Sequence, residues 1–336
     1  MPTLAIGKST AILITYHATI MLLLTPLLTR ISRSFSLQRI SHLLFALLTL
    51  MSLASTWSNM YRYFARSYTE SGAGSVEEWL QGTGLFMEAW GVVSGGREGY
   101  WWTAQVCGVC AGVLTPLFFV EGRRRGIGGL GRFMALAQLV AISFATSLFF
   151  LTLVTTTPLA RPLPRPSLRI LTPCVLLSLA TVPFLDPTKS TFLPLLLAMH
   201  ALLFPPFFTP KKDMKVRATI EEETPALHFL YVVIAYVNCA SYIWYTYQYA
   251  WNHPAGILGG MKALLGHMFT HPARASIGWD LVCVSAALLV WFVVTAEGGR
   301  RVHALWTGVL GMVLVGPAGQ SALELATREA PEDDTP

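Results

Sequence analysis

Nine apolar segments dominate this chain of 336 residues, and polar connections separate them. Most approach the roughly 20 residues that an α-helix needs to cross a bilayer. Only 12% of the residues are charged, about half the share typical of soluble domains. Because hydrocarbon offers the backbone no hydrogen-bonding partners, such segments are expected to be helical. The segments are 11–29, 40–57, 101–121, 133–156, 168–184, 191–208, 226–247, 277–297 and 302–318.

The sequence therefore predicts an all-α, polytopic transmembrane helical bundle with eight or nine spans. The two counts differ in how the proline-broken segments 168–184 and 191–208 are treated. A single transmembrane domain is expected over residues 1–326, followed by a disordered polar tail at 327–336. The apolar stretch Ala11–Leu28 is expected to be the first span and a signal anchor, because it is longer than the core of a cleaved signal.

The formal net charge of +6 comes from arginines in the loops, such as Arg123–Arg125. Basic loops of membrane proteins mark the cytosolic side and attract anionic headgroups, so the bilayer is an expected partner and nucleic acid is not. Four loops carry several basic residues each, and they cannot all lie on one side of a simple alternating topology. The orientation therefore stays open.

Neither a metal nor a cofactor is expected. All five cysteines lie in apolar segments, where a free thiol behaves as a small apolar group. Cys107 and Cys110 have the spacing of a metal or redox pair but no second pair accompanies them, and His267 and His271 lack a clear third ligand. No nucleotide-binding loop or Asp-rich diphosphate-binding motif is present, so ionisation of a prenyl diphosphate is not expected.

Two parts of the chain look alike. Each has aromatic residues before a long loop, and then an apolar segment that ends in an acid, glycine and arginines. The interval is 16 residues from Gln105 to Glu121 and 17 from Asp280 to Glu297. We interpret this as a diverged internal repeat, which is a common way to build a bundle around a central site. The repeat-like units cover about 40–156 and 226–318.

Glu121 and Glu297 have two interpretations. The arginines that follow each of them favour an ion pair at a helix end, and a catalytic role is the alternative.

The loop 65–100 between two spans has a distinct sequence pattern. Ser75 and Glu78 have the spacing of a helix N-cap, which predicts an interfacial or re-entrant helix that caps one mouth of the bundle.

Asp280 and Glu88 are the candidate catalytic residues. Asp280 lies near the start of an apolar segment, where a charge beside hydrocarbon is costly unless it has a role. Burial favours the neutral acid, which is the form that a Brønsted-acid catalyst needs. The alternative is an interfacial helix N-terminus, where the dipole favours aspartate. Glu88 lies among Phe86, Met87 and Trp90, and its alternative is the wet face of an amphipathic helix.

Uncharged polar and aromatic residues complete the predicted site. Amides near or within apolar segments can orient an acid or bind a substrate hydroxyl, or they can simply join helices by hydrogen bonds. Aromatic rings can stabilise a cation in a cavity, or they can form the belt at the membrane interface. The predicted substrate-binding residues are Asn59, Gln105, Asn238, Tyr242, Tyr245, Trp102 and Trp279.

From about residue 40 to 318 the chain resembles the integral membrane terpene cyclases of fungal meroterpenoid pathways, of the ascofuranone-forming kind. The similarity lies in Asn59, Glu88–Trp90, Trp101–Gln105, Glu121–Arg125, Gln138–Phe150 and Trp279–Glu297. The resemblance implies acid-catalysed cyclisation of a prenylated substrate that carries a terminal epoxide or alkene, without metal or diphosphate loss. It also implies a location in the endoplasmic reticulum membrane.

In this interpretation Asp280 is the general acid, and Glu88 is a second acid or the base of the final deprotonation. Two other functions stay open. A proton-coupled small-molecule transporter or efflux component would also use repeats, broken spans and intramembrane acids. A lipid- or sterol-binding scaffold would need no single essential acid.

Overall fold

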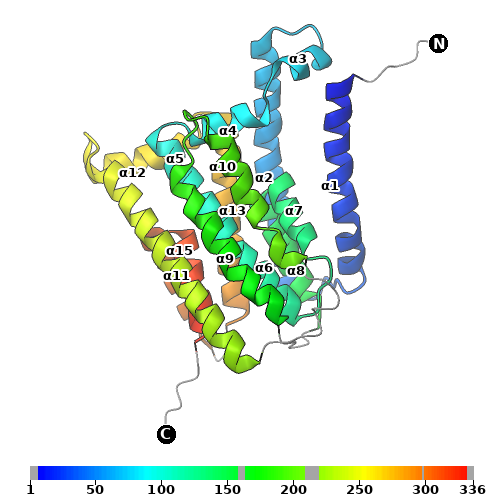
Figure 1. The fold of residues 1–336 in the computed structure, drawn as a ribbon, viewed down its shortest axis with the longest axis vertical. Coiled ribbons are helices and arrows are strands. Elements are labelled where there is room, and N and C mark those ends of the chain that lie inside the picture. Colours follow the sequence, from blue (N-terminus) through cyan, green and yellow to red (C-terminus); the bar gives the residue numbers. More distant parts are fainter. Residues whose placement is uncertain (1–6, 158–162, 209–218, 297–298, 331–336) are drawn as a thin grey trace, which may run out of the picture.

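The computed structural model describes residues 7–157, 163–208, 219–296 and 299–330, and these residues form a bundle of helices (Figure 1). The predicted all-α class is confirmed. Within the described residues, five helices are long and apolar enough to cross a membrane, and four further apolar helices are shorter. The five long ones are Lys8–Ser32, Ile40–Ser71, Gly96–Arg124, Glu222–Trp251 and Pro272–Val294.

The helices have the following bounds. The first half contains α1 (Lys8–Ser32), α2 (Ile40–Ser71), α3 (Val76–Gly82), α4 (Phe86–Ser94), α5 (Gly96–Cys107), α6 (Thr115–Arg124), α7 (Gly131–Leu139) and α8 (Ile142–Val154). The second half contains α9 (Arg165–Thr181), α10 (Phe192–Leu202), α11 (Ile220–Thr246), α12 (Gly256–His267), α13 (Pro272–Val294), α14 (Arg301–Val315) and α15 (Pro317–Arg328).

A continuous helical rod, Gly96–Arg124, forms the centre of the bundle. It consists of α5, a π-helical stretch at Gly108–Leu114 and α6, and its apolar part is buried by the helices around it. Two glycines let α11 approach closely. A Cβ atom at Gly108 would lie 2.2 Å from Oδ1 of Asn238, and one at Gly112 would lie 2.9 Å from Cγ2 of Ile234. Small residues at such crossings allow close helix packing within a membrane.

The predicted span 133–156 is two helices instead of one. Helix α7 ends at Leu139 and α8 begins at Ile142, because Ala141 between them is extended, with φ −172° and ψ 146°. The sequence has neither proline nor glycine at this break. The break is explained by contacts from other helices, which take up the freed backbone groups.

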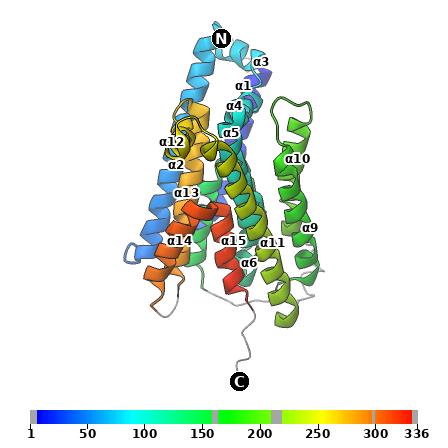
Figure 2. The same ribbon diagram turned by 90° about the vertical axis from the view of Figure 1, so that its left-hand side faces the viewer.

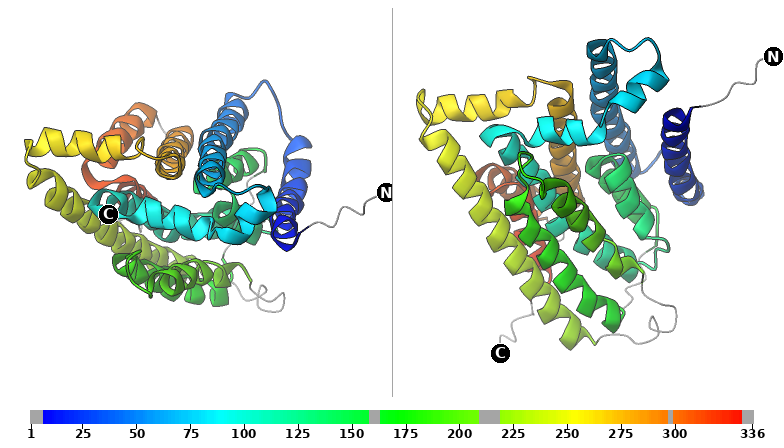
Figure 3. Two further views of the ribbon diagram at one scale, coloured as in Figure 1. Left: turned by 90° about the horizontal axis from the view of Figure 1, so that it is seen from above. Right: turned by 45° about the horizontal axis from the view of Figure 1, so that its top comes forward.

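The loop 65–100 is helical along most of its length. Helix α2 extends to Ser71 and ends at Gly72, whose φ of 64° lies in the left-handed region that favours glycine. The predicted N-cap is confirmed: the Ser75 hydroxyl accepts a hydrogen bond from the Glu78 amide at 3.2 Å. Helices α3, α4 and α12 lie at the same end of the bundle (Figures 1 and 3).

The C-terminal part differs from the prediction. The segment 302–318 ends as α14 at Val315, and the chain then turns at Gly316, with φ 81°, into α15, which packs against α11 and α14 (Figure 2). The start of the expected polar tail, at residue 327, is too early in the sequence. Arg328 still belongs to α15, and Glu329 is buried in an ion pair. The remainder, 331–336, lies outside the described residues.

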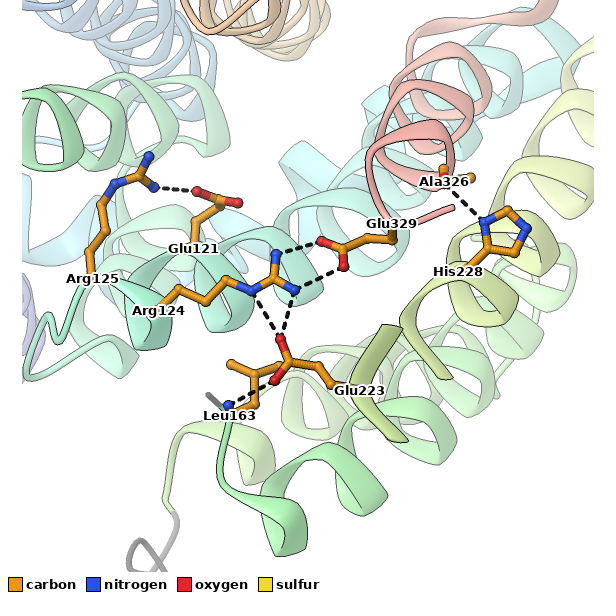
Figure 4. Close-up of polar contacts among 8 residues, drawn as sticks. All are labelled: Glu121, Arg124, Arg125, Leu163, Glu223, His228, Ala326 and Glu329. Atoms are coloured by element: carbon orange, nitrogen blue, oxygen red, sulfur yellow. Dashed lines mark hydrogen bonds and ion pairs between the residues drawn. The ribbon is translucent and has the colours of Figure 1, made fainter. Parts of the chain in front are cut away.

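An ionic cluster joins three helices (Figure 4), at the end of the bundle opposite α3 (Figure 1). The Arg124 guanidinium on α6 donates to the Glu223 carboxylate on α11 at 2.7 and 3.0 Å, and to Glu329 beyond α15 at 2.5 and 2.8 Å. Glu223 also accepts a hydrogen bond from the Leu163 amide at 2.9 Å. We call Arg124, Glu223 and Glu329 the ionic clasp. The predicted ion pair of Glu121 is present, with Arg125 as its partner. Glu297 lies outside the described residues.

We predict that Arg124→Ala lowers the melting temperature of the detergent-solubilised protein strongly. The change leaves two mostly buried carboxylates close together without their cation, which costs on the order of 3–5 kcal/mol. Arg66→Ala is the matched control, since it removes an exposed pair with Glu70 that is worth about 0–1 kcal/mol. Equal melting temperatures for the two variants would contradict a stabilising role of the clasp.

A second prediction concerns Glu77 on α3, which accepts hydrogen bonds from the Thr10 hydroxyl at 2.7 Å and from the amides of Thr10 and Ser9 at the start of α1. These bonds, the one from the Thr10 hydroxyl foremost, lower the pKa of Glu77 from 4.5 to about 2. Because this pKa is lower in the folded state, the contact is at full strength above pH 4.5 and is lost as the pH falls toward 2.

Glu77→Gln is therefore expected to speed hydrogen exchange at the amides of Ser9 and Thr10 several-fold at pH 7. In the unmodified protein, protection of these amides relative to intrinsic exchange should stay constant from pH 5 to 8. Glu70→Gln on the exposed end of α2 serves as the control. Unchanged exchange in the Glu77 variant would mean that α3 does not hold the start of α1.

Candidate functional site

A cavity of about 660 Å³ lies among α1, α2, α4, the central rod, the α7–α8 break, α10 and α13. Figure 3 shows how these helices surround the α4 end of the bundle. The lining is mostly apolar and aromatic. The volume of the cavity is in the range of sites that bury a drug-sized ligand. The polar or titratable residues of the lining are Tyr16, His17, Thr56, Trp57, Tyr61, Trp90, Cys107, Cys110, Gln138, His200, Ser276 and Asp280.

Asp280 carries the carboxylate of this cavity and caps the N-terminus of α8. Its Oδ1 accepts from the Ser143 amide at 2.7 Å and its Oδ2 from the Ile142 amide at 3.1 Å. These amides have no partner within their own helix, and the dipole of α8 places positive potential at the same point. The side chain is 5% exposed.

The structure alters one interpretation of Asp280. Because α13 begins at Pro272, Asp280 lies more than two turns inside its own helix rather than at an interfacial N-terminus. The helix end that the carboxylate stabilises belongs to α8, which is distant in sequence. A helix terminus at this depth can accept a charged ligand or side chain without a metal or a lysine beside it.

The carbonyl groups freed by the α7–α8 break also have partners. The Tyr16 hydroxyl donates to the Leu139 carbonyl oxygen, and the Trp57 indole N–H donates to the Val140 carbonyl oxygen at 3.4 Å. Both donors line the cavity from α1 and α2. Three helices thus stabilise the break through residues that also form the cavity wall.

Aromatic rings from several helices line the cavity. Trp57 packs edge-on against Tyr61, with centroids 5.4 Å apart, and Tyr16 lies 5.6 Å from Phe86. Trp90 lies near the histidine of α10, with centroids 6.4 Å apart. Ring faces of this kind attract cations, most strongly where water is excluded.

Of the predicted site residues, Asp280 alone lines the cavity. Glu88 is exposed and accepts hydrogen bonds from the Thr83 hydroxyl and the Gly84 amide, both at 2.8 Å, so it caps its own helix. Glu88 therefore does not share the cavity with Asp280. Asn59 lies on α2 and donates to the Ser55 carbonyl oxygen instead.

The other predicted binding residues lie between helices or on the outside. The Asn238 amide donates to the Ile234 carbonyl oxygen on its own helix, and Gln105 is buried in the central rod beside Gly316. The Tyr242 hydroxyl donates to the Val313 carbonyl oxygen. Tyr245 contacts Tyr100, Trp102 donates to the Leu264 carbonyl oxygen, and Trp279 is 37% exposed. Trp102, Tyr242 and Tyr245 thus link different helices, whereas the Asn238 amide bonds within its own helix.

Sequence reasoning missed several cavity residues. Nothing in the local sequence of His200 points to a cavity, and Cys110 lies in an apolar segment where a free thiol packs as a small apolar group. The Gln138 amide, which contacts Sγ of Cys110 at 3.3 Å, begins the stretch Gln138–Phe150 of the resemblance but is not among the predicted site residues. A usable signal was the aromatic pair Trp57 and Tyr61, four residues apart on one helix face.

Comparisons with known proteins cover part of this architecture. A family model described as "Protein of unknown function DUF2834" matches residues 230–330, less than a third of the chain. This region runs from α11 to the end of α15 and includes Asp280. No curated protein matches the chain, and no solved structure matches it.

We predict that Asp280→Asn destabilises the break between α7 and α8. An asparagine amide would present N–H groups to one of the two α8 amides, which leaves that buried donor unpaired at a cost of about 1–3 kcal/mol. The melting temperature in detergent should fall, and the amides of Ile142 and Ser143 should exchange faster. Asp186→Asn, at a partly exposed aspartate, is the control. An unchanged melting temperature would show that the cap contributes little.

Proposed function

We propose that the protein is a membrane-bound terpene cyclase that starts the reaction by protonating an epoxide or alkene at the end of a prenyl chain. The observation that carries the proposal is the Asp280 carboxylate, buried in an apolar, aromatic cavity and bonded to two helix N-terminal amides. An acid, a dry cavity and aromatic faces are what such a reaction requires.

The chemistry follows from the position of the proton. The neutral carboxyl of Asp280 gives its proton to the epoxide oxygen, the C–O bond opens, and the nearest alkene attacks the developing carbocation. The carboxylate left behind is already stabilised by the amides of Ile142 and Ser143. Because this stabilisation grows as the proton leaves, it favours the transition state more than the bound substrate.

The proposal includes four finer points, on the number of spans, the repeat, the location and the substrate. The shorter apolar helices would complete a bundle of eight or nine spans, the units 40–156 and 226–318 would form a diverged repeat, and the protein would lie in the endoplasmic reticulum membrane. The substrate would be a farnesyl-type chain attached to an aromatic or other core, which a lipophilic cavity inside a bilayer can take up without a water-filled path.

A proton-coupled transporter is the second candidate, and the break between α7 and α8 favours it. Broken helices whose N-termini face a buried site are typical of secondary transporters. Uptake into vesicles that depends on a pH gradient would support this alternative, whereas product formation in detergent requires a catalyst.

We predict that microsomes containing the protein convert an epoxyfarnesyl-aryl compound into a product of unchanged mass and altered retention time. Asp280→Asn should lower kcat by roughly 10²–10⁴-fold, as expected for loss of a general acid, while binding of a non-reactive analogue persists. Glu88→Gln is the control and should keep near-normal turnover. Normal turnover by folded Asp280→Asn would refute the proposed acid.

A further inference from the structure

A protonation-initiated cyclisation needs a second group that removes a proton at its end, and Glu88 lies outside the cavity. This inference rests on the proposed function. The group must line the cavity, carry a free lone pair and lie away from the acid, because the cation moves along the chain as rings form. Among the described residues that line the cavity, His200 meets these conditions.

The local geometry of His200 sets its tautomer. Nδ1 lies 2.6 Å from the Leu196 carbonyl oxygen, one turn earlier on α10. A carbonyl oxygen only accepts hydrogen bonds, so Nδ1 carries the hydrogen and Nε2 of the neutral ring carries the lone pair. No described residue makes a hydrogen bond to Nε2. The ring of Trp90 lies edge-on beside the imidazole.

His200 and Asp280 lie on different walls of the cavity. His200 is in the last turn of α10 and Asp280 is in α13, and Figure 2 shows these helices on opposite sides of the bundle. A second histidine provides a comparison. Nδ1 of His17 contacts the Leu13 carbonyl oxygen in the same way, but its Nε2 lies 3.4 Å from the Tyr61 hydroxyl.

We propose that Nε2 of His200 is the proton acceptor that ends the cyclisation. The C–H bond next to the final cation breaks, its electron pair becomes the new C=C bond, and the proton moves to Nε2. Asp280 is then a carboxylate and His200 an imidazolium. Transfer of one proton between them through water admitted at product release restores both groups. The substrate is isomerised, and no oxidant or reductant is consumed.

The test compares product distributions for His200→Gln and His200→Phe with that of the unmodified protein. Both variants lack a basic nitrogen, and glutamine retains the chance of a hydrogen bond to the Leu196 carbonyl oxygen, so it serves if the phenylalanine variant does not fold. We expect the normal alkene to form roughly 10²-fold more slowly. Substrate consumption should fall much less. The normal alkene should be replaced by other alkene isomers and by a water adduct 18 mass units heavier.

His228→Phe is the matched control: Nδ1 of His228 also contacts a carbonyl oxygen, that of Ala326, but His228 lies on α11 and does not line the cavity, so the product ratio should stay unchanged. A normal product ratio in the folded His200→Gln variant would overturn the assignment, and so would loss of substrate consumption without any new product, because His200 would then act before the cation forms. Failure of the unmodified protein to convert any such substrate would overturn the proposed function itself, which separates the two results.

Discussion

The contact between Asp280 and the start of α8 is the interaction on which the cavity depends. A helix that breaks within a bilayer exposes amide and carbonyl groups, and hydrocarbon offers them no partner. Here the carboxylate accepts hydrogen bonds from the amides of Ile142 and Ser143. Tyr16 and Trp57 donate hydrogen bonds to the carbonyl oxygens on the other side of the break. Residues from α1, α2 and α13 are thereby brought together at the α7–α8 break, which forms part of the cavity wall.

The two ends of the bundle are stabilised in different ways. At one end the ionic clasp holds α6, α11 and the end of α15 together. At the other end, helices α3 and α4 cover the bundle and Glu77 links α3 to the start of α1. The cavity lies nearer this second end, where α4 contributes part of its lining. An end closed by short helices suits the lipophilic substrate that we propose for this cavity.

Much of the helical architecture was predictable, and most of the candidate site was not. The apolar segments became helices, and Ser75 capped α3 as its spacing predicts. Asp280 was predictable because a carboxylate in an apolar segment must have a partner. Glu88 has similar neighbours but a different role, because the Gly84 amide and the Thr83 hydroxyl lie within its reach. The sequence around His200 gave no signal, because the role proposed for this residue depends on the cavity beside α10.

The sequence by itself determined that the chain forms apolar helices of membrane-spanning length, because the run of hydrophobic residues and the scarcity of charge leave the backbone no other way to satisfy its hydrogen bonds. Only the tertiary structure decided where a helix breaks and which side chains share a cavity. Ala141 is extended because Asp280, 139 residues later, stabilises the helix that follows it. Packing across the bundle brings Asp280 to the start of α8, and the residues next to either position in the sequence do not predict this contact.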